Sequence, residues 1–285
     1  MAELYEPRVL VEGLAYVESP RWHDGRLWFS HWGCEEVLAV DIEGNCEVAS
    51  PGRPGMGWAT EWLPDGRLLV TGETLLRREP DGSFVVHADL SGVFTGGCDE
   101  IVVDGRGDIY VNSIEFDFVG GGEPTGGIIA LITPDESVRR VAGDLAFPNG
   151  MAVTPDNSTL IVAESYGRRL TAFGVDVDGS LSNRRVWADL GEGAPDGICL
   201  DADGAVWFAD VPNQRCVRVR EGGEVLETVE LDRGCFACML GGPDRRTLFM
   251  LATEWAGPED VEEQLARRTG RIYVADVETP GAGWP

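Results

Sequence analysis

One short unit recurs along the whole sequence: an apolar run, a turn built on Asp-Gly or Pro-Asp, and a second apolar run. Asp-Gly between two short apolar runs is typical of a β-hairpin, because a type I′ turn needs a positive φ at both of its central residues. The copies follow one another at roughly 40–50 residues, which is the period of propeller blades. The turn aspartates of the repeats are Asp24, Asp65, Asp104, Asp156, Asp203 and Asp244.

A second hairpin follows these units, as in EVLAVDIEGNCEVAS and GIIALITPDESVRRVAGDL. Two hairpins make a four-stranded antiparallel sheet, so the sequence predicts an all-β fold, a six-bladed β-propeller with four-stranded antiparallel blades, as a single domain over residues 1–285. The last repeat offers only about three strands, and we expect the N-terminal RVLVEGL to supply the fourth and close the ring. The stretch GPEDVEEQLARRTG predicts a short helical insertion over residues 258–269. A β-sandwich also uses short strands, but the six copies at this period favour the propeller.

The composition limits which binding partners and which cellular compartment are expected. A formal net charge of −26 makes nucleic acid and anionic membrane surfaces poor partners. No apolar run approaches the roughly 20 residues of a membrane helix, and MAELYEPRVLVEGLAY lacks the pattern of a signal peptide. Seven cysteines without framework spacing suit a reducing environment. We therefore expect a cytoplasmic protein, and a closed propeller needs no obligatory protein partner to protect its sheet edges.

Two of the cysteines, Cys235 and Cys238, form a C-x-x-C pattern inside an apolar run. A zinc site would need a second pair, and none is present at the required spacing. Buried packing in a strand is the better interpretation of both residues.

The first strand of each propeller blade lines the central channel, and its start opens onto one face. Counting back five to seven residues from each turn aspartate gives the equivalent position in every repeat, and four of the six positions carry an oxygen donor. Several oxygens that converge on one axis suit a hard divalent cation, with calcium preferred and zinc, magnesium or manganese left open. The alternative is that Asn and Asp before glycine are ordinary turn formers. The equivalent positions are Glu18, Trp58, Asp99, Asn149, Asp196 and, in the last repeat, Phe236 or Ala237.

Three motifs around these positions resemble the metal-site motifs of the gluconolactonase/regucalcin (senescence marker protein) family: ESPRW at 18–22, FPNGM at 147–151 and PDGI at 195–198. More distantly they are similar to the squid-type diisopropylfluorophosphatase and paraoxonase propellers. The resemblance extends from VEGLAYVESPRW to the closing PGAGWP. It implies one divalent ion in the channel and hydrolysis of lactones or related esters. By the same resemblance the metal ligands are Glu18, Asn149 and Asp196, with Asp99 beside the ion as a ligand or substrate contact.

The chain departs from the family pattern around Asp99. Sugar-lactone members carry Arg-x-Asn-Asp-Gly at this point, whereas this chain has GCDEI at 97–101. The arginine is absent, so a multidentate donor for sugar hydroxyls is missing. Asp in place of Asn adds a third acid around the ion, which favours tight cation binding or leaves one carboxylate free as a base.

These residues predict a metal-dependent lactonase in which the cation polarises the carbonyl and a carboxylate activates water. Asp196 is the first candidate for the general base and Asp99 the second. Two alternatives stay open: a phosphotriesterase-like hydrolase that uses the same metal site, and a calcium-binding propeller without catalysis. No G-x-S-x-G elbow is present for a serine mechanism. The residues expected to contact a small lactone or ester substrate are His31, Trp58, Glu115, Phe116 and Phe236.

Overall fold

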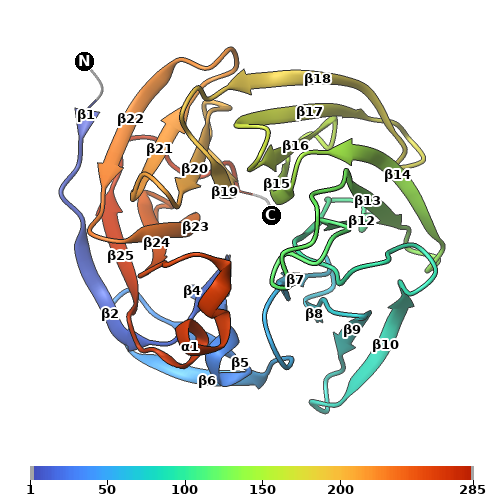
Figure 1. The fold of residues 1–285 in the computed structure, drawn as a ribbon, viewed down its shortest axis with the longest axis horizontal. Helices are drawn as coiled ribbons and strands as arrows, with labels where there is room; N and C mark the ends of the chain where they lie inside the picture. Colours follow the sequence, from blue (N-terminus) through green and yellow to red (C-terminus); the bar gives the residue numbers. More distant parts are fainter. Residues whose placement is uncertain (1–2, 284–285) are drawn as a thin grey trace.

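Six antiparallel sheets are arranged in a ring in the computed structural model, which describes residues 3–283 (Figure 1). This arrangement confirms the six-bladed β-propeller, and residues 284–285 of the closing PGAGWP lie outside the described residues.

In blades 1 to 5 the strands follow one another in chain order from the ring centre outward. Blade 1 contains β3 (Val17–His23), β4 (Arg26–His31), β5 (Glu36–Val40) and β6 (Cys46–Pro51). Blade 2 contains β7 (Thr60–Trp62), β8 (Leu68–Val70), β9 (Thr74–Arg78) and β10 (Phe84–Asp89). Blade 3 contains β11 (Ile101–Val103), β12 (Ile109–Ser113), β13 (Gly127–Ile132) and β14 (Val138–Leu145). Blade 4 contains β15 (Pro148–Val153), β16 (Thr159–Glu164), β17 (Arg169–Val175) and β18 (Leu181–Asp189). Blade 5 contains β19 (Pro195–Leu200), β20 (Val206–Asp210), β21 (Arg215–Val219) and β22 (Val225–Glu230).

Blade 6 is assembled from both ends of the chain. Its inner strands are β23 (Gly234–Gly241), β24 (Thr247–Thr253) and β25 (Gly270–Asp276), and its outermost strand is β2 (Arg8–Leu14). The segment β2 is the RVLVEGL stretch that was expected to complete this blade. A further short strand, β1 (Glu3–Leu4), pairs in parallel with β22 at the edge of blade 5, which the repeat pattern does not indicate.

In the part of the chain that the structure describes, helical structure is limited to one 3-10 turn in blade 1 and one insertion before β25. Within the segment expected to be helical, η2 (Pro258–Asp260) leads into α1 (Val261–Ala266), and β25 begins four residues later. The helix lies against η1 (Trp32–Cys34) of blade 1, so closely that a Cβ on Gly33 would lie 2.1 Å from the carbonyl oxygen of Leu265. No helix among the described residues is long and apolar enough to cross a membrane.

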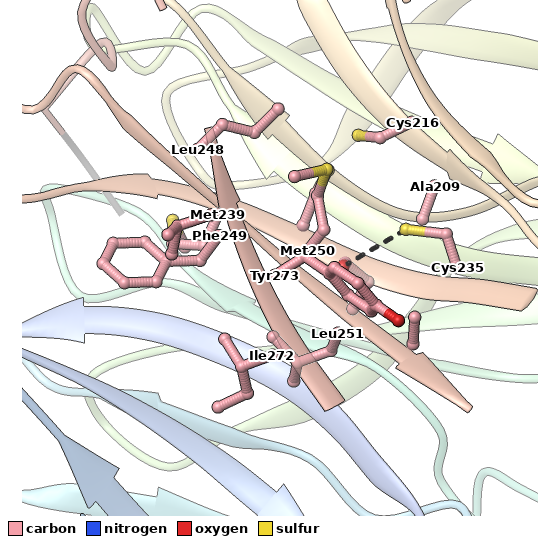
Figure 2. Packing of buried hydrophobic residues seen from close by; sticks show 14 of the residues in the cluster. Ala209, Cys216, Cys235, Met239, Leu248, Phe249, Met250, Leu251, Ile272 and Tyr273 are labelled. Carbon is pink, nitrogen blue, oxygen red and sulfur yellow. Dashed lines mark hydrogen bonds between the residues drawn. The ribbon is translucent and has the colours of Figure 1, made fainter. Parts of the chain in front are cut away.

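The core lies within and between the blades, because each sheet buries both faces against its neighbours. The middle strands are buried almost throughout, whereas the outermost strands of blades 1 to 5 are half exposed. Figure 2 shows the packing of Phe249, Leu251 and Ile272 in blade 6. Cys235 and Cys238 are buried free cysteines of β23 within this core, so the C-x-x-C pattern serves packing here.

Candidate metal and substrate site

A cavity of about 830 Å3 opens where the innermost strands begin. It brings together the four oxygen-bearing side chains at the equivalent repeat positions, which come from blades 1, 3, 4 and 5. A second cavity, of about 740 Å3, is lined by residues of the inner strands and of hairpin turns, and these four side chains are not part of its lining. The four side chains in the first cavity are Glu18, Asp99, Asn149 and Asp196.

The inner strands β3, β15 and β19 are irregular next to Glu18, Asn149 and Asp196. The pairing register shifts between Glu18 and Arg21 in β3, between Pro148 and Met151 in β15, and between Pro195 and Ile198 in β19. Such bulges re-aim a side chain next to a functional site. The proline near Glu18, Asn149 and Asp196, with the glycine that follows Asn149 and Asp196, therefore marks a bulge in an inner strand and does not form a hairpin turn.

Two glycines allow the inner strands to approach one another. A Cβ on Gly150 would lie 2.7 Å from the carbonyl oxygen of Asp196, and a Cβ on Gly197 would lie 2.7 Å from the Cα and Cβ atoms of Ala237. Contacts this short are not tolerated. Gly150 thus lets β15 pack against the backbone of Asp196, and Gly197 lets β19 pack against β23.

The cavity floor holds an excess of buried acid. Burial raises the pKa of Glu18 and of Asp196 well above the usual range, and repulsion from neighbouring carboxylates adds to the effect. Burial and then the charge of Glu100 raise the pKa of Asp99 to about 7. An uncompensated cluster of this kind calls for a cation.

Arg21 is the buried cation beneath this cluster, and it is already engaged. Its Nε donates to Glu61 Oε2 at 2.6 Å, and its Nη2 donates to the carbonyl oxygen of Ile101 at 2.6 Å and lies 3.5 Å from Glu100. Arg21 therefore compensates Glu61 and Glu100. The cavity lining contains no arginine, lysine or histidine among the described residues, so Glu18, Asp99 and Asp196 have no cationic partner there.

This donor set fits a hard divalent ion, since it offers carboxylate and amide oxygens only. Glu18, Asn149 and Asp196 are the residues that would hold such an ion, and Asp99 lies in the same cavity. An ion would offset the repulsion among these acids, which after burial is the next cause of the raised pKa of Glu18 and Asp196.

A different group of metal-type side chains lies in blade 1, where donor atoms of His31, Cys34 and Glu36 come within 4.8 Å of one another. The backbone N–H of Ala15 donates to His31 Nε2 at 2.9 Å, so the imidazole proton must lie on Nδ1, which faces Glu36 Oε2 at 3.2 Å. Both ring nitrogens are thus occupied. Arg268 Nη2 also lies 3.4 Å from Cys34 Sγ, so this group suits a structural hydrogen-bond network better than a cation.

Three of the five residues expected to contact substrate line the cavity: Glu115, Phe116 and Phe236. His31 does not, because its ring is buried between Ala15 and Glu36. Trp58 is also outside the lining, since its ring is buried and its indole N–H donates to the carbonyl oxygen of Gly55 at 3.2 Å. The substrate role expected for His31 and Trp58 is not supported by these positions.

Three residues of the site were missed by the sequence reasoning. Tyr16 lines the cavity, and its pKa is raised well above 10 by burial and then by the charges of Asp196 and Glu18. Its position two residues before Glu18 puts it on the same face of an extended chain, which is a usable signal. Glu100 and Arg21 form an ion pair across blades 1 and 3, and no local pattern reveals it.

Comparison with known families identifies this architecture. Residues 16–254 match the family model described as SMP-30/Gluconolactonase/LRE-like region. The chain belongs to this family. The matched range includes all four oxygen-bearing side chains of the cavity.

Curated relatives of the SMP-30/Gluconolactonase/LRE-like family align over part of their length. A 6-deoxy-6-sulfogluconolactonase of Pseudomonas putida is 26% identical over 166 residues, which are 56% of this chain and 56% of the relative. A regucalcin of Xenopus laevis is 31% identical over 153 residues, covering 52% of this chain and 50% of the relative. The aligned part thus spans about half the length of each of these relatives.

Solved structures of the family match the fold over nearly the whole chain. A calcium-binding protein, regucalcin, of Agrobacterium tumefaciens has a TM-score of 0.81 at 21% identity and covers 100% of this chain and 99% of its own. A gluconolactonase of Xanthomonas campestris has a TM-score of 0.73 at 23% identity and covers 95% of this chain and 89% of its own. At these identities the likeness establishes the fold.

Proposed function

We propose that this protein is a metal-dependent hydrolase that opens a lactone or a related cyclic ester. The observation that carries the proposal is the set of three carboxylates without a cationic partner at the floor of a cavity large enough for a small molecule. The family supports it, since relatives bear the names gluconolactonase and 6-deoxy-6-sulfogluconolactonase. Calcium is the preferred ion, because the donors are all oxygens and the structurally similar regucalcin of Agrobacterium tumefaciens is described as a calcium-binding protein.

In this proposal Glu18, Asn149 and Asp196 hold the ion. When bound, it supplies the positive charge that polarises the lactone carbonyl. The amide of Asn149 donates to Ser165 Oγ at 3.5 Å, and the Ser165 hydroxyl donates to the carbonyl oxygen of Pro195, the residue before Asp196. The register shifts and close-packed glycines keep these side chains at fixed positions in the inner strands.

Asp196 and Asp99 are the two candidates for the base that takes a proton from the attacking water. Both are buried enough to have a raised pKa, and both keep some exposure to the cavity. A general base works best when its pKa lies near the working pH. Asp196 is also a ligand in this proposal, so loss of its carboxylate removes binding and catalysis together, whereas loss of Asp99 tests the base alone.

Tyr16 is suited to stabilise the negative charge that develops on the carbonyl oxygen. Its raised pKa keeps the hydroxyl protonated at any working pH, so it remains a hydrogen-bond donor. The ring is fixed by stacking on Trp32 at 5.3 Å and by an edge contact with Phe236 at 4.8 Å. A donor held rigidly beside the reacting group needs no reorganisation during the reaction.

The test is to remove metal from the purified protein with a chelator, restore calcium, and follow acid release from a panel of γ- and δ-lactones. We expect turnover only with the restored ion. Glu18→Gln should abolish calcium binding and turnover, whereas the matched Glu36→Gln, in the blade 1 group, should leave both unchanged.

Tight calcium binding without turnover of any lactone would contradict the proposal. Hydrolysis of phosphotriesters by the same calcium-loaded protein would then favour the phosphotriesterase alternative. Loss of metal binding in Glu36→Gln, but not in Glu18→Gln, would move the metal site to His31, Cys34 and Glu36.

A further inference from the structure

One side of the cavity is built from aromatic rings, which we call the aromatic wall: Phe116, Phe118, Phe147 and Tyr166. The ring centroids of Phe147 and Tyr166 are 4.7 Å apart, and those of Phe118 and Phe147 are 5.3 Å apart. The wall joins three segments that are distant in the sequence: the loop between β12 and β13, the residue before β15, and the turn after β16. Four rings in mutual contact present a continuous apolar surface to anything bound in the cavity.

The wall is not explained by folding alone. Tyr166 remains 53% exposed and Val119, beside it in the lining, remains 51% exposed. Phe147 has a φ of +59°, a backbone conformation that bulky side chains rarely adopt. Exposed apolar groups and local strain that gather in one cavity indicate ligand binding.

The serine and threonine hydroxyls of the lining are engaged within the protein, which leaves fewer side-chain donors for a polyol. The hydroxyl of Ser165 donates to the carbonyl oxygen of Pro195 at 2.7 Å, and the hydroxyl of Thr95 donates to Glu115 at 2.6 Å. The protein's own groups thus already occupy these donors. Sugar hydroxyls that displaced water without finding partners would bind weakly.

Anionic substrates are also disfavoured. Within residues 3–283, the ionisable residues that line the cavity are acids, two tyrosines and Cys98, and no basic side chain is among them. Arg21 lies beneath the floor in its ion pair with Glu61, and Arg53 lies against Gly72, outside the lining. An anionic group far from the metal position would meet mostly like charge, since the acids of the lining outnumber Arg53, whose charge reaches Cys98.

From these four observations, and resting on the proposed lactonase function, we propose that the substrates are uncharged lactones that carry a hydrocarbon substituent. The substituent lies on the aromatic wall while the lactone carbonyl faces the carboxylate cluster. Polyhydroxylated lactones and lactones with an anionic group bind poorly. Tyr166 is then a residue that determines substrate specificity and takes no part in the bond-breaking step.

The test compares two lactones with the same six-membered ring, δ-decalactone and D-glucono-δ-lactone, on the calcium-loaded protein. We expect kcat/KM to be at least about tenfold higher for δ-decalactone than for D-glucono-δ-lactone. Only δ-decalactone has a hydrocarbon substituent that can contact several aromatic rings of the wall. Tyr166→Ala should raise KM for δ-decalactone about three- to tenfold and leave kcat unchanged, while Tyr166→Phe, which keeps the ring, should match the parent protein. Because Tyr166 is half exposed, the alanine variant should fold normally.

Binding of the δ-lactam that matches δ-decalactone, measured by calorimetry, separates this inference from the proposed function. If neither lactone is hydrolysed but the lactam binds and Tyr166→Ala weakens its binding, the lactonase proposal fails and the apolar preference stands. If D-glucono-δ-lactone is hydrolysed as efficiently as δ-decalactone, the apolar preference is wrong and the lactonase proposal stands. Failure of the lactam to bind, or equal binding to the parent and Tyr166→Ala, also overturns the inference.

Discussion

Replacing Asp99 by asparagine should stabilise the metal-free protein at high pH. The pKa of this carboxyl is raised from 3.8 to about 7, first by burial and then by the charge of Glu100. A difference of about three pH units corresponds to about 4 kcal/mol of folding free energy, and the partial exposure of Asp99 to the cavity reduces this to about 2–4 kcal/mol. The folded state binds this proton more tightly than the unfolded state does. The contribution of Asp99 is therefore most favourable below about pH 4 and is lost as the pH rises towards 7.

The measurement is urea unfolding in the presence of chelator at several values between pH 4 and pH 8. Asp99→Asn has no charge to ionise, so its free energy of unfolding should exceed that of the parent by about 2–4 kcal/mol at the upper end and converge with it at the lower end. Asp24→Asn is the matched control, because Asp24 lies exposed in a hairpin turn. This change should shift stability by less than about 0.5 kcal/mol at every pH.

Saturating calcium should remove the stability advantage of Asp99→Asn. In the parent protein the bound ion compensates the charge of the Asp99 carboxylate, and the variant has no such charge to compensate. The reasoning is refuted if Asp99→Asn is no more stable than the parent at pH 8 in chelator. It is equally refuted if the gain is the same at pH 4 as at pH 8, since a gain independent of pH would come from packing.

Three further changes test the site. Gly197→Ala would place a Cβ 2.7 Å from Ala237 and should lower the free energy of unfolding by about 1–3 kcal/mol. The control Gly92→Ala, whose Cβ would have nothing within 4 Å, should leave this free energy unchanged. Equal urea midpoints for the two variants would contradict the packing argument. Calcium affinity measured by calorimetry should fall as the pH is lowered from 8 to 5, because carboxylates with a raised pKa take up protons that compete with the ion. An affinity that does not change with pH would argue against this cluster as the ligand set. Tyr16→Phe should lower kcat on the best lactone about a hundredfold without changing calcium affinity, and an unchanged kcat would exclude the hydroxyl from the reaction.

The blade pattern was readable from the sequence because hairpin turns are local. An Asp-Gly or Pro-Asp turn between two apolar runs depends on a few adjacent residues, and its recurrence set the blade count. The equivalent positions before each turn then indicated Glu18, Asn149 and Asp196, which the structure places in one cavity.

Tertiary contacts determined what the sequence could not indicate. The orientation of His31 depends on the backbone N–H of Ala15, sixteen residues away. The pairing of Arg21 with Glu100 joins residues that are 79 positions apart, so the number of uncompensated acids at the site could not be derived from spacing. Trp58 occupies an equivalent repeat position, yet its large ring is buried in a core cluster that also contains Tyr16, Trp32 and Phe236.

The pairing of β2 with β25 has a consequence for the synthesis of this protein. Arg8 pairs with Val274, so β2 is synthesised early but has no strand to pair with in blade 6 until almost the whole chain has left the ribosome. Contacts of such long sequence separation form late and slowly. Glu18 and Asp196 lie on either side of this blade, in blades 1 and 5, so a nascent chain without β25 cannot hold them at their final separation. Calcium present during translation would therefore find its complete set of ligands only at the end of folding. It would bind, and so stabilise, only the closed ring.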